Sequence, residues 1–170
     1  SPVHGREATF RSLRTRMNVR LLDDTSPTGP AGDNGRFSLD ELAAAVLSDR
    51  SMSAELLRAP LVARCEKTST VTLDGRAVDV SRACRTLAAW DGTFNLESRG
   101  AILWREFITQ YRGTDFGRAG RLFAKDFEAA DPIGTPRDLA AEAAGADPGT
   151  GPLGSLARAV LVMERASLDL

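Results

Sequence analysis

Apolar residues recur three and four positions apart through most of this sequence, and this helical spacing is the feature that most constrains its fold. Residues 80–88 show it clearly, and Asp91-Gly92 is expected to end that helix. Strand formers are sparse, because aromatic residues make up only 6% of the chain and alanine is frequent. The sequence therefore predicts a mainly α-helical domain. The other segments with helical spacing are 10–22, 101–112 and 153–161.

The helix predicted at 10–22 has an apolar side and a polar side made almost wholly of arginine. We expect the arginine side to be solvated or ion-paired. A loop rich in Pro, Gly and Asp follows at 23–37. The apolar side holds Phe10, Leu13, Met17 and Leu21, and the polar side holds Arg11, Arg14, Arg16 and Arg20.

A capping box opens the next predicted helix. The Ser38 side chain can accept from the amide of Glu41, whose carboxylate can reach back to residue 38. A further helix is predicted from a cap at Ser53 towards Cys65, and Pro60 is a point where it can kink or split. The residues that the first of these helices is expected to bury are Leu39, Leu42, Ala43, Val46 and Leu47.

Strand character is confined to residues 69–78, where Asp74-Gly75 suits a type I′ turn. Beyond it, residues 113–134 are expected to be irregular. Thr135-Pro136-Arg137-Asp138 predicts the start of a helix that Gly145 ends. The expected architecture is an irregular helical bundle with at most one short β-hairpin. We divide its single unit, residues 1–170, into a helical core (1–113), a loop-rich stretch (114–152) and a terminal helix (153–170).

Composition excludes several functions. Twenty-two basic and 23 acidic residues give a net charge of −1, so no basic field is present to hold nucleic acid or an anionic membrane. One His and two Cys cannot close a zinc site of Cys and His ligands. No apolar run is long enough for a membrane span. We expect no metal, no cofactor, no nucleic-acid partner and no membrane partner.

Three candidate sites are disfavoured by the residues around them. Ser1 could act as an N-terminal nucleophile, but that chemistry needs two stacked sheets. His4, the only His, stands in a terminal segment with nothing to hold it. Residues 33–42 look like half of a calcium loop, yet the same register places Pro30 and Gly32 where side-chain oxygens are needed. The two cysteines, 19 positions apart, are compatible with buried thiols or with a disulfide.

Two adjoining runs carry a resemblance. Residues 83–92 are ACRTLAAWDG, and residues 95–107 are NLESRGAILWREF. Together they resemble the AC..L..WDG....dSRGA.L..EF stretch of the penicillin acylase family, within the branch of aculeacin A and acyl-homoserine lactone acylases. Residues 11–17 resemble the Arg-rich helix start of that family. The capped helix that begins at 38–42, and Cys65 after it, occur in the same order along the chain as in that family.

This resemblance implies a secreted or periplasmic enzyme that hydrolyses a linear amide and releases an acyl chain, as from an antibiotic, a lipopeptide or an acyl-homoserine lactone. Such precursors cut themselves into two chains, and the β-chain begins with the catalytic serine of an N-terminal-nucleophile hydrolase. The present chain looks like the helical section of that β-chain. The nucleophile and the oxyanion-stabilising Asn are not in this sequence, so the chain alone is expected to be inactive. Its implied partners are the remaining parts of the α- and β-chains.

The resemblance also implies roles for single residues. The family places an Arg near the active site at the start of a helix, and this position matches Arg14, with Arg16 as the alternative register. Export favours a disulfide between Cys65 and Cys84. A face made for the rest of the enzyme should be exposed, and the aromatic side of 101–112 is a candidate. The rival hypothesis is a non-catalytic helical interaction module.

Overall fold

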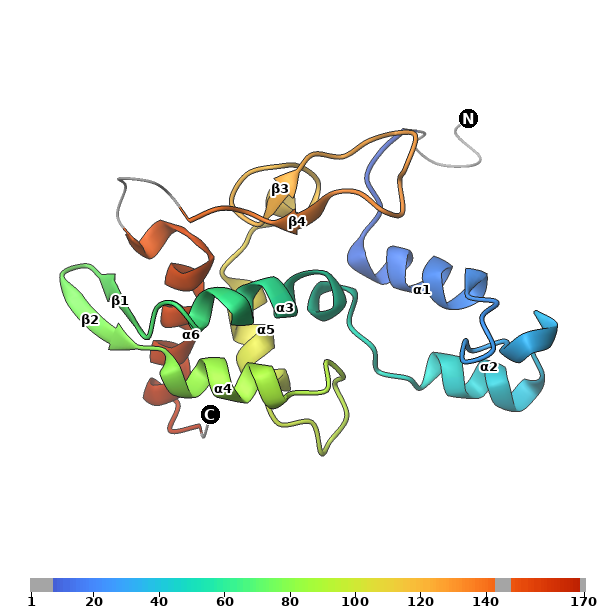
Figure 1. The fold of residues 1–170 in the computed structure, drawn as a ribbon, viewed down its shortest axis with the longest axis horizontal. Coiled ribbons are helices and arrows are strands. Elements are labelled where there is room, and N and C mark those ends of the chain that lie inside the picture. Colours follow the sequence, from blue (N-terminus) through green and yellow to red (C-terminus); the bar gives the residue numbers. More distant parts are fainter. Residues whose placement is uncertain (1–7, 143–147, 169–170) are drawn as a thin grey trace.

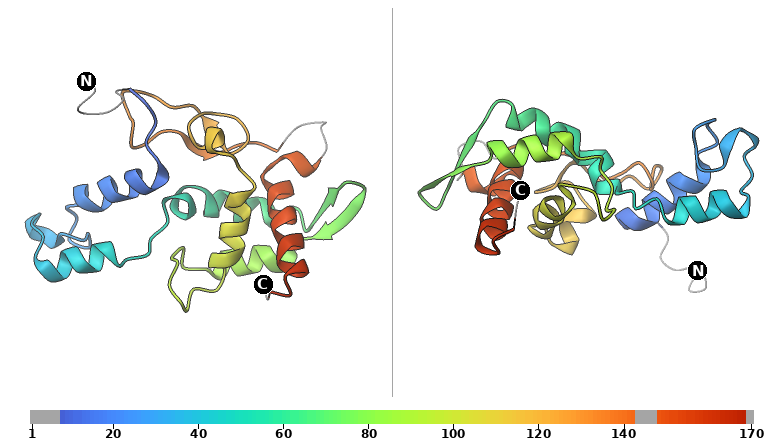
Figure 2. Two further views of the ribbon diagram at one scale, coloured as in Figure 1. Left: turned by 180° about the vertical axis from the view of Figure 1, so that it is seen from behind. Right: turned by 90° about the horizontal axis from the view of Figure 1, so that it is seen from below.

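The computed structural model describes residues 8–142 and 148–168, and it is mainly α-helical with two short antiparallel strand pairs (Figure 1). Helices α3 to α6 form the body, and α1 and α2 lie together to one side of it (Figure 2). The helices are α1 (Leu13–Asp23), α2 (Leu39–Val46), α3 (Met52–Cys65), α4 (Ser81–Ala89), α5 (Ala101–Thr109) and α6 (Pro152–Arg165). The strands are β1 (Thr70–Leu73), β2 (Arg76–Asp79), β3 (Phe123–Lys125) and β4 (Arg137–Leu139). Short 3₁₀ turns lie at Gly32–Asn34, Gly113–Phe116 and Pro148–Thr150.

Aromatic side chains fill the centre of the body. Trp104 of α5 is fully buried, with its ring centroid 5.7 Å from that of Trp90 and 5.0 Å from that of Phe107. Tyr111 continues the row, 5.5 Å from Phe107. The expectation that the aromatic side of 101–112 is exposed was wrong, because this side is where α5 packs on α6 and α3.

Tyr111 is the only tyrosine of the chain, and its burial raises the pKa of the phenol to about 12, although Ser155 and Arg121 act in the opposite direction. The unfolded chain loses this proton near pH 10, whereas the folded chain keeps it up to about pH 12. We therefore expect the contribution of Tyr111 to stability to be complete below pH 10. About 2–3 kcal/mol should be lost as the pH rises from 10 to 12.

Absorbance at 295 nm isolates this titration, since no second tyrosine contributes. The folded chain should titrate near pH 12 and the chain in guanidinium near pH 10. Unfolding at pH 8 and 11 should differ more for the native chain than for Tyr111→Phe. A folded-state midpoint near pH 10 would contradict the buried phenol.

The predicted hairpin is confirmed. β1 and β2 pair with Thr70 opposite Asp79, and Asp74 and Gly75 form the turn with positive φ values of 49° and 79°. Both residue types tolerate this backbone, which the type I′ turn requires. The inward residues are buried against α6 and the core: Val71, Leu73 and Val78.

A disulfide joins the C-terminal end of α3 to α4. The Cα atoms of Cys65 and Cys84 are 5.7 Å apart, and the hairpin lies within the closed loop. The bond therefore fixes α3, the hairpin and α4 as one unit.

Removing this bond is expected to lower the free energy of unfolding by about 3 kcal/mol, because the unfolded chain regains the freedom of a 19-residue loop. Denaturant unfolding of the native chain, with and without a reductant, measures the loss. A Cys65→Ala/Cys84→Ala variant is the control, and it should be insensitive to the reductant. Equal midpoints for the oxidised and reduced native chain would contradict the prediction.

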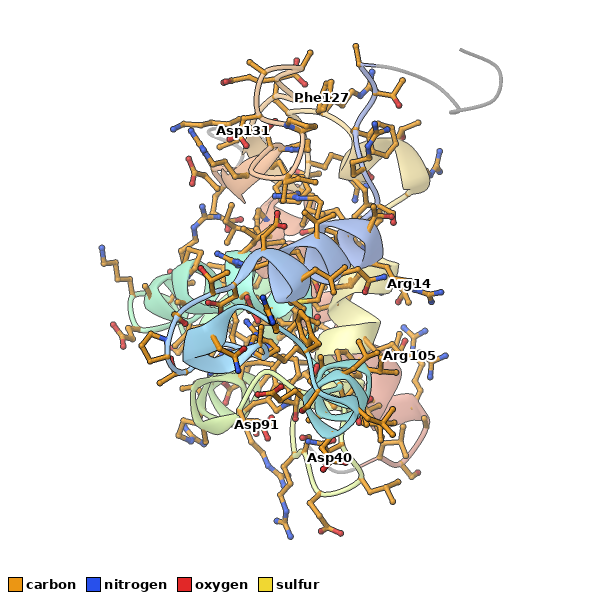
Figure 3. All side chains as sticks on the ribbon, turned by 90° about the vertical axis from the view of Figure 1, so that its right-hand side faces the viewer. Arg14, Asp40, Asp91, Arg105, Phe127 and Asp131 are labelled. Atoms are coloured by element: carbon orange, nitrogen blue, oxygen red, sulfur yellow. A yellow bond between two sulfur atoms is a disulfide. The ribbon has the colours of Figure 1, made fainter. Side chains whose placement is uncertain are left out.

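The helix predicted from residue 135 is not present; β4 lies there instead and pairs with β3. Thr135 is fully buried, donates its hydroxyl to the carbonyl of Asp131 (2.7 Å) and accepts from the amide of Glu128 (2.8 Å). These local bonds hold 128–135 as a closed loop, above the body in Figure 1, and deliver the chain extended to β4 (Figure 3). Gly145, the predicted helix end, lies outside the described residues.

Two helices also differ from expectation at their boundaries and faces. Ser51, not Ser53, caps α3 by accepting from the amide of Ala54 (3.4 Å), and the helix is continuous through Pro60. The capping box of α2 is confirmed: Glu41 N–H donates to Ser38 Oγ (3.3 Å), and Ser38 N–H to Glu41 Oε2 (2.7 Å). The burial predicted for α2 was wrong, since Ala45 is its one buried residue. Those expected inside are exposed: Leu39, Leu42, Ala43, Val46 and Leu47.

Candidate functional site

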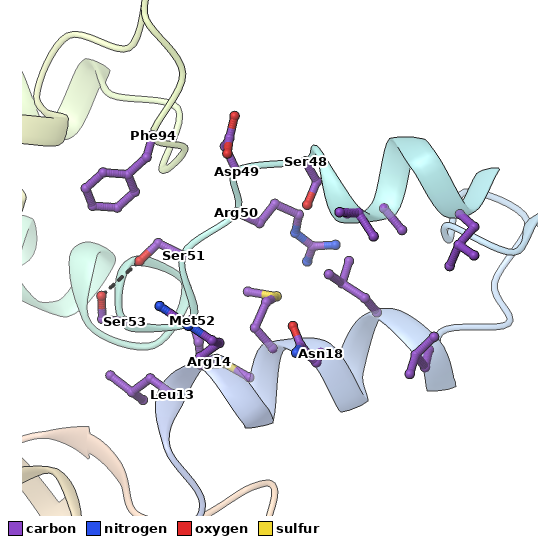
Figure 4. A pocket seen from close by; sticks show the side chains of 16 residues that line it. Leu13, Arg14, Asn18, Ser48, Asp49, Arg50, Ser51, Met52, Ser53 and Phe94 are labelled. Carbon is purple, nitrogen blue, oxygen red and sulfur yellow. Dashed lines mark hydrogen bonds between the residues drawn. The ribbon is translucent and has the colours of Figure 1, made fainter. Parts of the chain in front are cut away.

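A groove of about 580 Å³ lies between α1 and α2 (Figure 4). α1 contributes one apolar wall and α2 the other, and the linker between α2 and α3 closes one end. Polar side chains stand at its rim, so it is an apolar trough with a few polar groups, the usual form of a binding site. The lining residues are Leu13, Arg14, Met17, Asn18, Leu21, Leu22, Leu42, Ala45, Val46, Ser48 to Ser53 and Phe94.

The wall from α1 is held by its own small cluster. Met17 and Leu21 pack with Met52 at the start of α3, and Leu13 joins this cluster to the main core. Phe10, predicted on the same stripe, precedes the helix and is exposed. The groove therefore rests on a fixed helix whose apolar stripe begins at Leu13.

Arg16 is fully buried, so it departs from the expectation that the arginines of α1 form a solvated or ion-paired face. Its Nε donates to the carbonyl of Ile133 (2.6 Å), and Nη1 donates to that of Pro136 (2.9 Å). Burial lowers the pKa of this guanidinium, and Asp131 opposes that shift. Arg16 is thus occupied in tying α1 to the loop before β4, and it is not available to a substrate.

Arg20, one turn further along α1, is paired. Its Nη1 lies 2.9 Å from Glu55 of α3, and Arg50 reaches the same carboxylate at 2.7 Å. The two arginines and Glu55 join α1, the linker and α3 at the end of the groove.

Arg14 differs from Arg16 and Arg20. It is exposed, lines the groove, and forms no hydrogen bond or ion pair with any residue that the structure describes. Figure 3 shows its side chain at the periphery of the molecule, well separated from the loop around Asp131. Of the two registers considered from the sequence, Arg14 is the one whose guanidinium is free to contact something else; a role in catalysis stays a prediction.

A short chain of hydroxyls connects the groove to the core. Ser51 and Ser53 lie 2.9 Å apart (Figure 4), and the buried Ser53 accepts from the indole Nε1 of Trp104 at 2.9 Å. Sequence reasoning missed the linker residues, because a linker has no periodic pattern that would mark it as part of a groove wall.

The WDG run proves to be a tightly bonded loop. Asp91 accepts from the amide of Thr93 (2.9 Å), from its hydroxyl (3.0 Å) and from Ser98 Oγ (3.1 Å). The bond from the Thr93 amide is the largest cause that holds the pKa of this carboxyl below its usual range. Trp90 Nε1 donates to the Thr93 carbonyl (2.8 Å). The loop presents Phe94 to the groove, a contact that the sequence did not predict.

Gly100 of the SRGA run is required by geometry. Its φ is +105°, and a Cβ there would lie 2.9 Å from the Cβ of Trp90. Arg58 donates to the carbonyl of Trp90 (2.5 Å) at the end of α4. These two runs therefore fix the start of α5 against the end of α4.

The remaining sequence candidates are two N-terminal residues and the calcium-like stretch. Ser1 and His4 lie outside the described residues. In the calcium-like stretch, Glu41 is engaged in the capping box. Residues 8–142 and 148–168 contain no group of three His, Cys, Asp or Glu side chains placed to hold a metal ion. None of the helices described is both long and apolar enough to cross a membrane.

Comparison with known proteins supports the family resemblance that the runs at 83–92 and 95–107 carry. A family model described as Penicillin amidase matches residues 2–167. The chain belongs to the penicillin amidase family. One curated member, the aculeacin-A acylase of Actinoplanes utahensis, is 37% identical over 136 residues, which are 79% of this chain and 16% of that relative.

Membership in the penicillin amidase family places the chain among acylase-like amidohydrolases. The match covers the groove, the disulfide and the Trp90–Trp104 core together. The alignment with the aculeacin-A acylase spans only 16% of the length of that relative, so most of that acylase has no counterpart in these 170 residues.

Proposed function

We propose that these residues form the helical section of the β-chain of an exported N-terminal-nucleophile acylase, which hydrolyses a linear amide and releases an acyl chain. The match to the penicillin amidase family over residues 2–167 carries this proposal. The disulfide between Cys65 and Cys84 supports export, because such bonds persist in oxidising compartments. The amide substrate is of the antibiotic, lipopeptide or acyl-homoserine lactone type, and the partners are the remaining parts of the α- and β-chains.

In this proposal the 170 residues have a supporting role. The family resemblance places the serine nucleophile and the oxyanion-stabilising Asn outside these residues, so we expect the chain alone not to turn over an amide. Arg14 positions groups around the nucleophile by hydrogen bonds from its guanidinium, whose planar fork suits a carboxylate or carbonyl oxygen. Its exposure and its lack of a described partner support this role.

The first test compares amide hydrolysis by the 170-residue chain and by the complete product of its gene. The complete product should release acid from a linear N-acyl amide, and the chain alone should not. Turnover by the chain alone would contradict its predicted inactivity. A gene product without a serine-headed β-chain would favour the interaction module instead.

The second test addresses Arg14. In the complete gene product, Arg14→Gln should lower kcat/KM about tenfold or more, because a fixed donor near the developing charge is lost. Arg14→Lys should recover only part, since a single ammonium cannot replace the fork. Arg105→Gln is the control: Arg105 is also exposed, has no described partner and lies on α5 (Figure 3). Equal losses in both glutamine variants would refute a specific role for Arg14.

A further inference from the structure

One helix of this chain leaves its apolar stripe uncovered. Leu39, Leu42 and Val46 of α2 are spaced to share one helix face, and their exposed fractions are 82%, 43% and 74%. The corresponding stripe of α4 and that of α5 are buried, with Leu87 and Phe107 both at 0%. The main apolar stripes of α4 and α5 are therefore covered, whereas that of α2 is not.

The uncovered stripe continues into the groove. Leu42 and Val46 line it from α2, and Leu22 on α1 and Phe94 of the WDG loop are exposed at its edge. The capping box keeps α2 formed, so the stripe belongs to a stable helix. Polar side chains, Arg14 and Asp49 among them, stand around the apolar centre (Figure 4). An apolar centre with a polar rim is the anatomy of a protein interface.

The length of related protein outside this chain indicates what covers the stripe. The aligned residues are 16% of the aculeacin-A acylase, so most of such an enzyme is available to pack here. The two groove helices also lie on the side of the molecule away from α6 (Figures 1 and 2), where none of the other described elements packs over α2.

We infer that the α2 stripe and the groove beside it are the docking site for an apolar segment of the same acylase, outside residues 1–170; this rests on the function proposed above. Side chains of the Leu, Val and Phe type suit both walls, since burying them removes apolar surface from water on each side. Docking fixes the α1–α2 pair and, with it, the backbone that carries Arg14.

The experiment uses a cysteine at Val46. Cys65 and Cys84 are bonded to each other, so within these 170 residues Val46→Cys introduces the one free thiol, and labelling is followed at position 46 by peptide mass. Val46 is exposed, and the substitution leaves the packing of the chain intact. The rate of reaction with a maleimide is measured in the 170-residue chain and in the complete gene product. The thiol should react readily in the first and at least tenfold more slowly in the second.

Asp40→Cys provides the matched control. It lies on α2 but off the apolar stripe, and it should react at similar rates in both proteins. Equal rates for Val46→Cys would overturn the inference, as would a gene product with no further residues. Protection in the isolated chain that disappears on dilution would assign the surface to a second copy instead. Labelling does not depend on turnover, so a protected thiol in an inactive product would refute the proposed function alone.

Discussion

Replacing Trp104 with alanine is expected to lower the free energy of unfolding by about 3–5 kcal/mol. The side chain is the largest of those that are fully buried, and it contacts the rings of Trp90 and Phe107. Its indole N–H also supplies the bond to Ser53 that joins α5 to α3. Alanine would leave a cavity between Trp90 and Phe107, and equilibrium unfolding in denaturant measures the loss.

Two further variants separate packing from hydrogen bonding. Trp104→Phe keeps much of the volume but removes the indole N–H that Ser53 accepts, which leaves this buried hydroxyl with Ser51 alone, so a loss of about 1–3 kcal/mol is expected. Leu22→Ala, on an exposed residue, should change stability by about 0.5 kcal/mol or less in the isolated chain. A Trp104→Ala loss no larger than that of Leu22→Ala would contradict the proposed core.

Arg16→Met should cost about 2–4 kcal/mol in the free energy of unfolding. Methionine fits the space along the stem, but the carbonyls of Ile133 and Pro136 lose the charged donor that satisfies them. The buried acceptors then remain unpaired, and the loop before β4 loses its link to α1.

Arg14→Met is the matched control on the same helix, because Arg14 is exposed and has no described partner. It should change stability by about 0.5 kcal/mol or less. Thermal or denaturant unfolding of the two variants gives the comparison. Similar midpoints would show that the Arg16 bonds contribute little, and would remove the distinction between the arginines of α1.

Local chemistry made the hairpin and the cap of α2 predictable. Asp74-Gly75 and Ser38-to-Glu41 each specify their backbone through neighbours a few residues away, and both formed as expected. Helix positions followed from the spacing of apolar residues in the same way. The disulfide depended instead on the family resemblance, since spacing alone left buried thiols open.

The features that could not be predicted from the sequence depend on contacts beyond the local pattern. Arg16 looks like its neighbours on a helical wheel, but its acceptors are 117 and 120 residues away. The pattern at 135–138 is typical of a helix start, and the bonds of Thr135 to residues 128 and 131 overrode it. The apolar stripe of α2 is a true amphipathic pattern, but its partner is not among the described residues.

The candidate site was only partly predictable for the same reason. Arg14 came from a family likeness, and its place at the groove is a fact of the fold. Phe94 and the linker 48–51 enter the groove because α3 and the WDG loop bring them there. The WDG and SRGA runs, which revealed the family, serve mainly to shape a turn around Asp91 and Gly100.

The bonds of Arg16 also set the order in which the chain can be completed. α1 is synthesised well before the carbonyls that Arg16 needs, which lie more than a hundred residues later. During translation the guanidinium must stay hydrated until residues 133–136 emerge and fold back over the body. Contacts of such sequence separation slow folding, so α1 is expected to acquire its native surroundings only after residues 133–136 have folded.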